Sequence, residues 1–167
     1  FNAGPPFFPS LYNNNVQIFQ SRDTAVILTE MIHDARIVPI AASEEAHRSL
    51  HDDLRLWSGD SKGYWEGDTL VVITRNFSDL TFSFSSQGTA VDKVLTERFT
   101  RTAADTVEYA FTVEDPTTFT DKVSAVIPMT KVAGQLYEYA CHEGNYGMVN
   151  ILRGARAQEQ REAAGAE

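Results

Sequence analysis

The fold is indicated first by residues 106–113, Thr106-Val107-Glu108-Tyr109-Ala110-Phe111-Thr112-Val113, in which a large apolar residue stands at every second position. Side chains point alternately to the two faces of a β-strand, so this stretch predicts a strand with one apolar and one polar face. A similar run from Val94 to Arg101 precedes it, and the turn residues Thr102 to Asp105 join the two. The pair is therefore predicted to form an antiparallel hairpin.

Further strands are predicted on both sides of this hairpin. Residues 69–76 contain Leu70-Val71-Val72-Ile73, a run without a polar face that we expect to be buried on both sides. The preceding Glu66-Gly67-Asp68 favours a tight turn, because glycine accepts a positive φ. The other segments with strand patterning are residues 16–20, 25–31 with an extension to Pro39, 64–65, 124–129 and 136–141, and residues 59–63 are predicted to be a turn.

The period changes between Ser43 and Trp57, where Ala46, Leu50 and Leu54 follow one another at intervals of four. This spacing predicts one short amphipathic helix, inserted among seven to nine antiparallel strands. Short turns between so many strands indicate a mainly β fold, and we expect an antiparallel barrel of calycin or lipocalin-like type, because closure removes exposed strand edges. A sandwich of two sheets is the alternative.

The composition divides the chain into three parts. Residues 1–15 are rich in Pro and Asn and predict an extended N-terminal arm, which Phe7, Phe8 and Tyr12 are expected to pin against the core. Residues 16–153 are predicted to form a single β-rich domain. Residues 154–167, rich in Ala, Glu, Gln and Arg, predict a polar helical tail.

The charge of the chain limits its partners. Its 167 residues include 23 Asp and Glu against 14 Lys and Arg, which gives a formal net charge of -9. An acidic surface repels phosphate backbones and anionic lipid, so we expect no nucleic acid partner. No apolar run approaches the ~18–20 residues needed to cross a bilayer, so membrane insertion is not expected either. A small-molecule ligand or substrate remains the expected partner, and the oligomeric state is left open.

Residues 59–72, Gly59-Asp60-Ser61-Lys62-Gly63-Tyr64-Trp65-Glu66-Gly67-Asp68-Thr69-Leu70-Val71-Val72, closely resemble the signature of a large family of uncharacterised bacterial proteins, many of them exported. The same family is resembled by residues 31–36, 96–99, 114–116 and 138–145. The resemblance implies an exported domain, periplasmic or extracellular, and implies no particular activity. Residues 41–54 depart from the family pattern, which has a shorter loop with Gly, Arg and Pro at this place.

The strand predicted at residues 136–141 carries the first candidate for chemistry. Glu138 and His142 are four residues apart and would project from the same face, with the small Ala140 between them. A carboxylate and an imidazole beside open space are what acid–base catalysis requires, and histidine titrates near neutral pH. If the strand faces the other way, the core is instead packed by Tyr137, Tyr139 and Cys141.

A second candidate is the charged group on the extension of residues 25–31. In a continuous strand Glu30, Asp34 and Arg36 share one face, and His33 takes the other. In a cavity Arg36 would orient an anionic or carbonyl oxygen of a substrate. The alternative is structural: an isolated buried charge costs several kcal/mol, so Arg36 would pair with a carboxylate at the barrel mouth.

No metal or cofactor is expected. His47 and His51 are four apart on the predicted helix, a spacing that allows two nitrogens to reach one ion, but no third ligand is identifiable. The sequence also lacks a phosphate-binding loop, a dinucleotide-binding glycine motif and the nucleophile motif of hydrolases.

Two classes of function fit these patterns. The first is an enzyme, an isomerase, lyase or hydrolase, that performs acid–base chemistry on a small molecule in a barrel cavity. Its predicted catalytic residues are His33, Glu138, Tyr139 and His142, and its predicted substrate-binding residues are Asp34, Arg36, Glu143 and Asn145. The second is a non-catalytic, lipocalin-like carrier in which the same groups orient a ligand. A purely structural extracellular module is the third interpretation.

Overall fold

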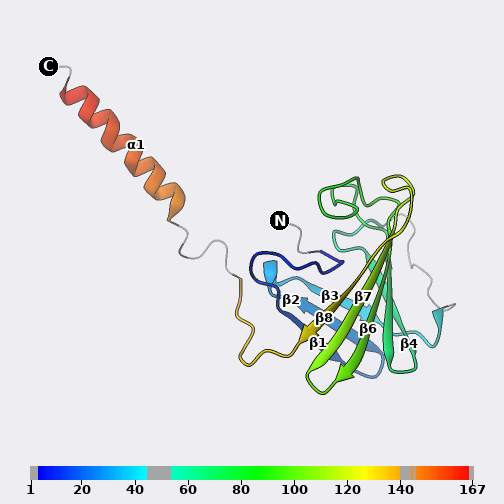
Figure 1. The fold of residues 1–167 in the computed structure, drawn as a ribbon. Helices are drawn as coiled ribbons and strands as arrows, with labels where there is room; N and C mark the ends of the chain where they lie inside the picture. The colour runs from blue at the N-terminus through cyan, green and yellow to red at the C-terminus, as the bar shows by residue number, and fades with distance from the viewer. Residues whose placement is uncertain (1–3, 45–53, 140–143, 145, 166–167) are drawn as a thin grey trace.

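The chain forms two antiparallel sheets in the computed structural model, which describes residues 4–44, 54–139, 144 and 146–165 (Figure 1). In both sheets, strands that are neighbours in sequence pair with each other, so each sheet is a simple meander. The first sheet contains β1 (Val16–Gln20), β2 (Thr24–Thr29) and β3 (Ala35–Pro39). The second contains β4 (Asp60–Glu66), β5 (Thr69–Arg75), β6 (Val94–Ala103), β7 (Thr106–Glu114) and β8 (Val123–Thr130).

The mainly β prediction is confirmed, and the barrel is wrong for the described part of the chain. No ladder of hydrogen bonds joins the two sheets there; β3 lies next to β4, and an isolated bridge links Ile40, the residue after β3, to Gly63 of β4. At the other end β1 and β8 do not pair with each other. Residues of the N-terminal arm and residues 131–136 line the space between these two edges. The arrangement is sandwich-like, as in the alternative.

The core lies between the sheets and follows the predicted periodicity. On β7, Tyr109, Phe111 and Val113 are buried, whereas Glu108 is exposed. Residues 70–74 of β5 are buried without a break, which confirms that this run packs on both faces. Its two faces contribute to two separate apolar clusters, the larger with Leu70 and Val72, the smaller with Val71 and Ile73.

Two local predictions are wrong. The strand expected to run from residue 25 to Pro39 is broken at η1 (Met31–His33), a 3-10 turn in which Ile32 has a left-handed φ of 64°. The Thr29 amide donates to the Asp34 carbonyl at 3.0 Å across this turn, so β2 and β3 form a hairpin instead of one strand. Residues 60–63, expected in a turn, belong to β4.

Two further segments differ from their predictions where the structure describes them. Residues 136–139 form no strand. The helix predicted at 43–57 lies largely outside the described residues, and residues 54–57 are not helical, because Leu56 bridges to Phe77.

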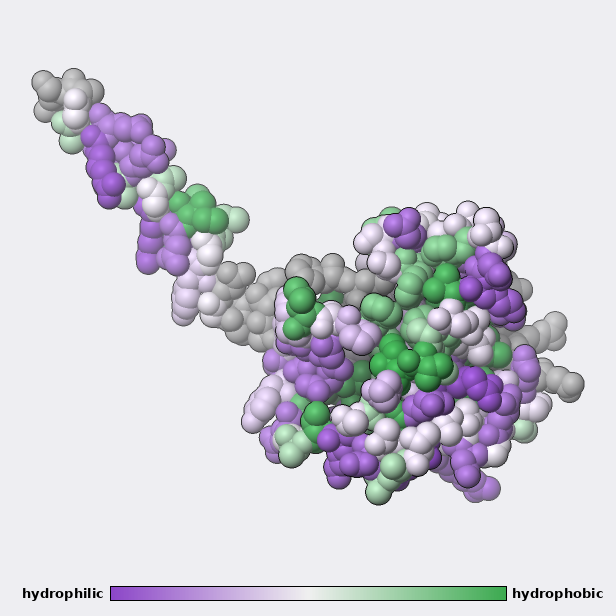
Figure 2. All heavy atoms as spheres, viewed as in Figure 1, coloured by the Kyte–Doolittle hydropathy of each residue, from purple (hydrophilic) through white to green (hydrophobic). Residues whose placement is uncertain are grey.

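The described part of the tail is helical up to Ala164, as predicted, but its helix α1 (Gly147–Ala164) begins before residue 154 and has no buried residue. Apolar residues lie in the half of α1 nearer the sheets and polar residues in the far half (Figure 2). Within the described residues, no helix combines the length and apolarity required to span a bilayer.

Two glycines with positive φ provide a test of the packing between β4 and β5. A methyl group on Gly59 (φ 73°) would lie 2.5 Å from Thr74 Cγ2 and 2.8 Å from the Arg75 carbonyl oxygen, whereas one on Gly67 (φ 57°) would meet nothing within 4 Å. Gly67→Ala should cost about 1 kcal/mol for its backbone conformation, and Gly59→Ala about 3 kcal/mol or more, because a steric clash is added. Urea unfolding checks this, and equal losses would contradict it.

Candidate functional site

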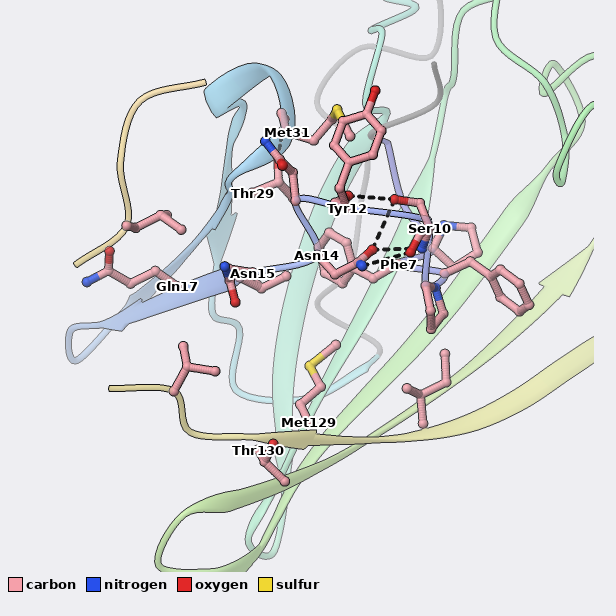
Figure 3. A pocket seen from close by; sticks show the side chains of 18 of the residues that line it. Phe7, Ser10, Tyr12, Asn14, Asn15, Gln17, Thr29, Met31, Met129 and Thr130 are labelled. Carbon is pink, nitrogen blue, oxygen red and sulfur yellow. Dashed lines mark hydrogen bonds between the residues drawn. The ribbon is translucent and has the colours of Figure 1, made fainter. Parts of the chain in front are cut away.

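The largest cavity in the described part of the chain is a groove of about 1500 Å³ between the arm and β8, which we call the β1–β8 groove. Its walls are residues 6–17 of the arm and β1 on one side and residues 127–136 on the other, with Thr29, Met31 and Phe84 between them. In Figure 3, Met129 rises from β8 toward Phe7, Tyr12 and Asn14 of the arm. Two segments more than a hundred residues apart therefore form one site.

Strand periodicity makes the β8 wall apolar. Along β8 the half-buried residues alternate with exposed ones, so Ile127 and Met129 face inward, whereas Val126 is 62% exposed. Both inward residues also pack against the main core. The apolar surface of the groove is thus a continuation of the core that no strand of the described chain covers, because β1 does not pair with β8.

The arm wall contains polar as well as apolar side chains, and hydrogen bonds within the protein fix several of the polar ones. The Asn14 side chain accepts from the Ser10 amide at 2.7 Å and donates to the Ser10 carbonyl at 2.9 Å, and the Ser10 hydroxyl donates to the Tyr12 carbonyl (Figure 3). Asn15 donates to the Glu30 carboxylate from both its backbone and its side chain, at 3.2 and 2.9 Å. These bonds hold the amide groups of the arm in place before any ligand arrives.

The inner end of the arm is anchored to the core. The Phe7 amide donates to the Tyr109 hydroxyl at 3.0 Å, and the two rings lie 5.5 Å apart between centroids. The Lys93 ammonium donates to the Pro5 carbonyl at 3.3 Å and lies 3.9 Å from the centre of the Phe77 ring. The prediction that aromatic residues pin the arm against the core is confirmed for Phe7 and is wrong for Phe8 and Tyr12, which are exposed.

Below the arm lies a buried polar cluster of five side chains from both sheets: Ser61, Thr74, Arg36, Glu97 and Tyr109. Arg36 is 7% exposed and Glu97 0%, and the guanidinium binds both carboxylate oxygens, at 2.5 and 3.0 Å. The Tyr109 hydroxyl donates to Glu97 at 2.8 Å, and Thr74 accepts from Arg36 at 3.3 Å. Burial and the negative charge of Glu97 hold the Tyr109 pKa far above its usual range, so the phenol stays a donor.

This cluster answers the question that the sequence left open at Arg36. The guanidinium pairs with a carboxylate, as in the structural alternative, and the partner is Glu97. Sequence reasoning missed Glu97, although it occupies an inward position of β6 between Leu95 and Phe99, where an acid is out of place. The alternation of residues along β6 could have indicated that Glu97 is buried, but it could not have identified Arg36 as its partner.

A second cavity, of about 660 Å³, does bring three predicted residues together. His33, Asp34 and Arg36 line it with Ser58, whose hydroxyl donates to Asp34 at 2.6 Å. The faces assigned to these residues from a continuous strand are wrong, because η1 interrupts the alternation.

The other predicted site residues are not placed at either cavity. Glu138 is exposed and Tyr139 half-buried, and neither is among the residues that line the groove or the second cavity. His142, Glu143 and Asn145 lie outside the described residues, as do His47 and His51 of the predicted helix. Their roles stay predictions. Among described residues, no three His, Cys, Asp or Glu side chains form a group that could hold a metal ion.

Comparisons with protein-family models, curated proteins and solved structures give no match to this chain. The resemblance to the exported bacterial family therefore stays a prediction. The fold and the site together define a mainly β domain with an open, partly apolar groove between two sheet edges.

Two ion pairs test how much of the stability depends on the buried cluster. Arg36→Ala leaves Glu97 charged in the core, so the free energy of unfolding should fall by about 3–5 kcal/mol. Arg98→Ala is the matched control: Arg98 contacts Glu66 at 2.6 Å, but these side chains are 42% and 47% exposed, and such pairs contribute at most about 1 kcal/mol. Chemical denaturation of both variants checks this, and similar losses would refute a structural role for the cluster.

The anchor of the arm predicts a pH dependence of stability. Lys93 is 3% exposed, and burial lowers its pKa from 10.5 to about 8, an effect that nearby Arg36 adds to and that Glu97 and Asp115 oppose. Between pH 8 and 10.5 the unfolded state binds more protons at Lys93, so the free energy of unfolding should rise with pH by up to about 3 kcal/mol relative to Lys93→Met. Denaturation of both proteins across this range checks it, and parallel pH curves would contradict it.

Proposed function

We propose that this domain binds a small, largely apolar molecule in the β1–β8 groove and acts as a non-catalytic carrier or binding domain. The observation that carries the proposal is the composition of the groove wall. Its described lining contains aromatic, aliphatic and amide side chains, and Lys131 is the single charged residue among them. Ligand sites are typically concave and mostly apolar, with a few polar groups that fix orientation.

The size and order of the groove support this function. Ligand pockets usually enclose roughly 300–1,000 Å³, so about 1500 Å³ leaves room for an elongated molecule. The hydrogen bonds of Ser10, Asn14 and Asn15 are made within the protein, which means that a ligand need not order the arm on binding. Such preorganisation lowers the entropic cost of association.

Acid–base catalysis is the second candidate, and one observation favours it: the second cavity is lined by His33, Asp34 and Arg36. In that function His33 would transfer the proton and Asp34 would face it. It is the weaker candidate because Arg36 is already bound to Glu97, and because Glu138 and Tyr139 do not line this cavity. In either case the resemblance to an exported family implies that the ligand is met outside the cytoplasm.

The neutral fluorescent probe N-phenyl-1-naphthylamine tests the binding proposal. Its emission should rise on addition of the wild-type protein, and Met129→Asp should weaken its binding at least about tenfold, because a charge then faces the apolar wall. Val126→Asp, on the outward face of the same strand, is the matched control and should bind as the wild type does.

A second groove variant separates binding from folding. Met31 lines the groove from η1 and is not among the residues of the main core, so Met31→Asp should weaken binding with little change in melting temperature. If neither groove variant changes the affinity of the probe, the groove is not its site and the proposal fails.

A further inference from the structure

Lys131 stands at one end of the β8 wall. It follows the last residue of β8 and lies an even number of positions from Ile127 and Met129, the inward-facing residues of that wall. Its backbone amide donates to the Asp105 carbonyl at 2.7 Å, which continues the contact of β8 with the β6–β7 turn and fixes where the side chain starts.

The four lysines of the chain differ in what their ammonium groups contact. Lys62 lies 3.6 Å from Asp60, Lys122 lies 3.0 Å from Glu114, and Lys93 is buried against Pro5 and Phe77. Lys131 makes no ion pair with any described carboxylate, although acidic residues outnumber basic ones in the chain. A cation that pairs with no described carboxylate and lies beside an apolar groove is available to a ligand.

The Glu30 carboxylate, near the opposite wall of the groove, already accepts hydrogen bonds from Asn15. Glu30 stands between Thr29 and Met31, which both line the groove, but its carboxylate accepts two hydrogen bonds from Asn15. Glu30 itself does not line the groove. The described lining of the groove contains no Asp or Glu residue. Lys131 is therefore the single charged side chain in the described lining of the groove, in a protein whose net charge is -9.

We propose that the groove selects amphiphiles with a single anionic head group, which pairs with Lys131 while the apolar body lies along Met129 and Ile127. This inference rests on the proposed binding function and specifies its ligand class. The distance from Lys131 to Ile127 is roughly 13 Å at ~3.3 Å per strand residue, and the groove continues to Phe84. An extended chain of about ten carbons therefore has apolar contacts along its whole length.

The test uses three ligands with the same ten-carbon chain: decanoate, 1-decanol and decyltrimethylammonium. Each is titrated against the wild-type protein loaded with N-phenyl-1-naphthylamine at pH 7.5 and low ionic strength, below its aggregation concentration. Decanoate should displace the probe at about fivefold lower concentration than decanol, and decyltrimethylammonium should be the weakest. Because the pair with Lys131 is partly solvated, the preference for decanoate should shrink when salt is added.

Two lysine variants locate the effect. Lys131→Met should remove the preference for decanoate over decanol, and Lys131→Glu should reverse it in favour of decyltrimethylammonium. Lys122→Met removes another lysine, one that pairs with Glu114 and does not line the groove, and should keep the wild-type preference. Melting temperatures of all three variants show that the fold is intact.

Each outcome decides one of the two proposals. If decanoate and decanol displace the probe equally from the wild type, or if the preference survives in Lys131→Met, the anionic head group is refuted and groove binding stands. If the probe does not bind the wild type, or binds regardless of changes at Met31 and Met129, the groove is not a binding site and both proposals fall.

Discussion

The arrangement of the two sheets depends on the buried pair of Arg36 and Glu97. Arg36 comes from β3 in the first sheet and Glu97 from β6 in the second, so this ion pair joins the two sheets through the apolar core that they share. Two charges in a core are tolerated only when each compensates the other in good geometry. The bidentate contact therefore restricts how the sheets can shift relative to each other, more narrowly than apolar packing alone would.

The same cluster also positions the wall of the groove. Tyr109 donates to Glu97 and accepts from the Phe7 amide, so a continuous chain of hydrogen bonds runs from the ion pair to the arm. The sheets are held together on the side of β3 and β4, and on the other side the arm occupies the space where β1 and β8 would have to meet. The position of the groove wall thus depends on the hydrogen bonds of the buried Arg36–Glu97 pair, as well as on the order of the strands.

Sequence patterns predicted the parts of this fold that are set locally. The hairpin of β6 and β7 and the two-sided burial of β5 follow from the spacing of apolar residues, which directly reflects the two faces of a strand. The turn at Ile32 carried no signal, because a β-branched residue disfavours a left-handed backbone and is held there by its surroundings. That the described sheets do not close could not be predicted either, since it depends on how β1 and β8, far apart in sequence, are placed relative to each other.

The candidate sites show the same division between local and distant information. Spacing along one predicted strand suggested that Glu138 and His142 share a face. Residues 136–139 form no strand, so the alternation of side chains between two faces does not apply to them. Both cavities are instead built from segments that periodicity cannot bring together. The large groove combines apolar area, fixed amides and one cation, and its described lining includes no histidine or carboxylate to move a proton. Groups of that kind can recognise and orient a ligand, and this composition is what supports the binding function proposed for the groove.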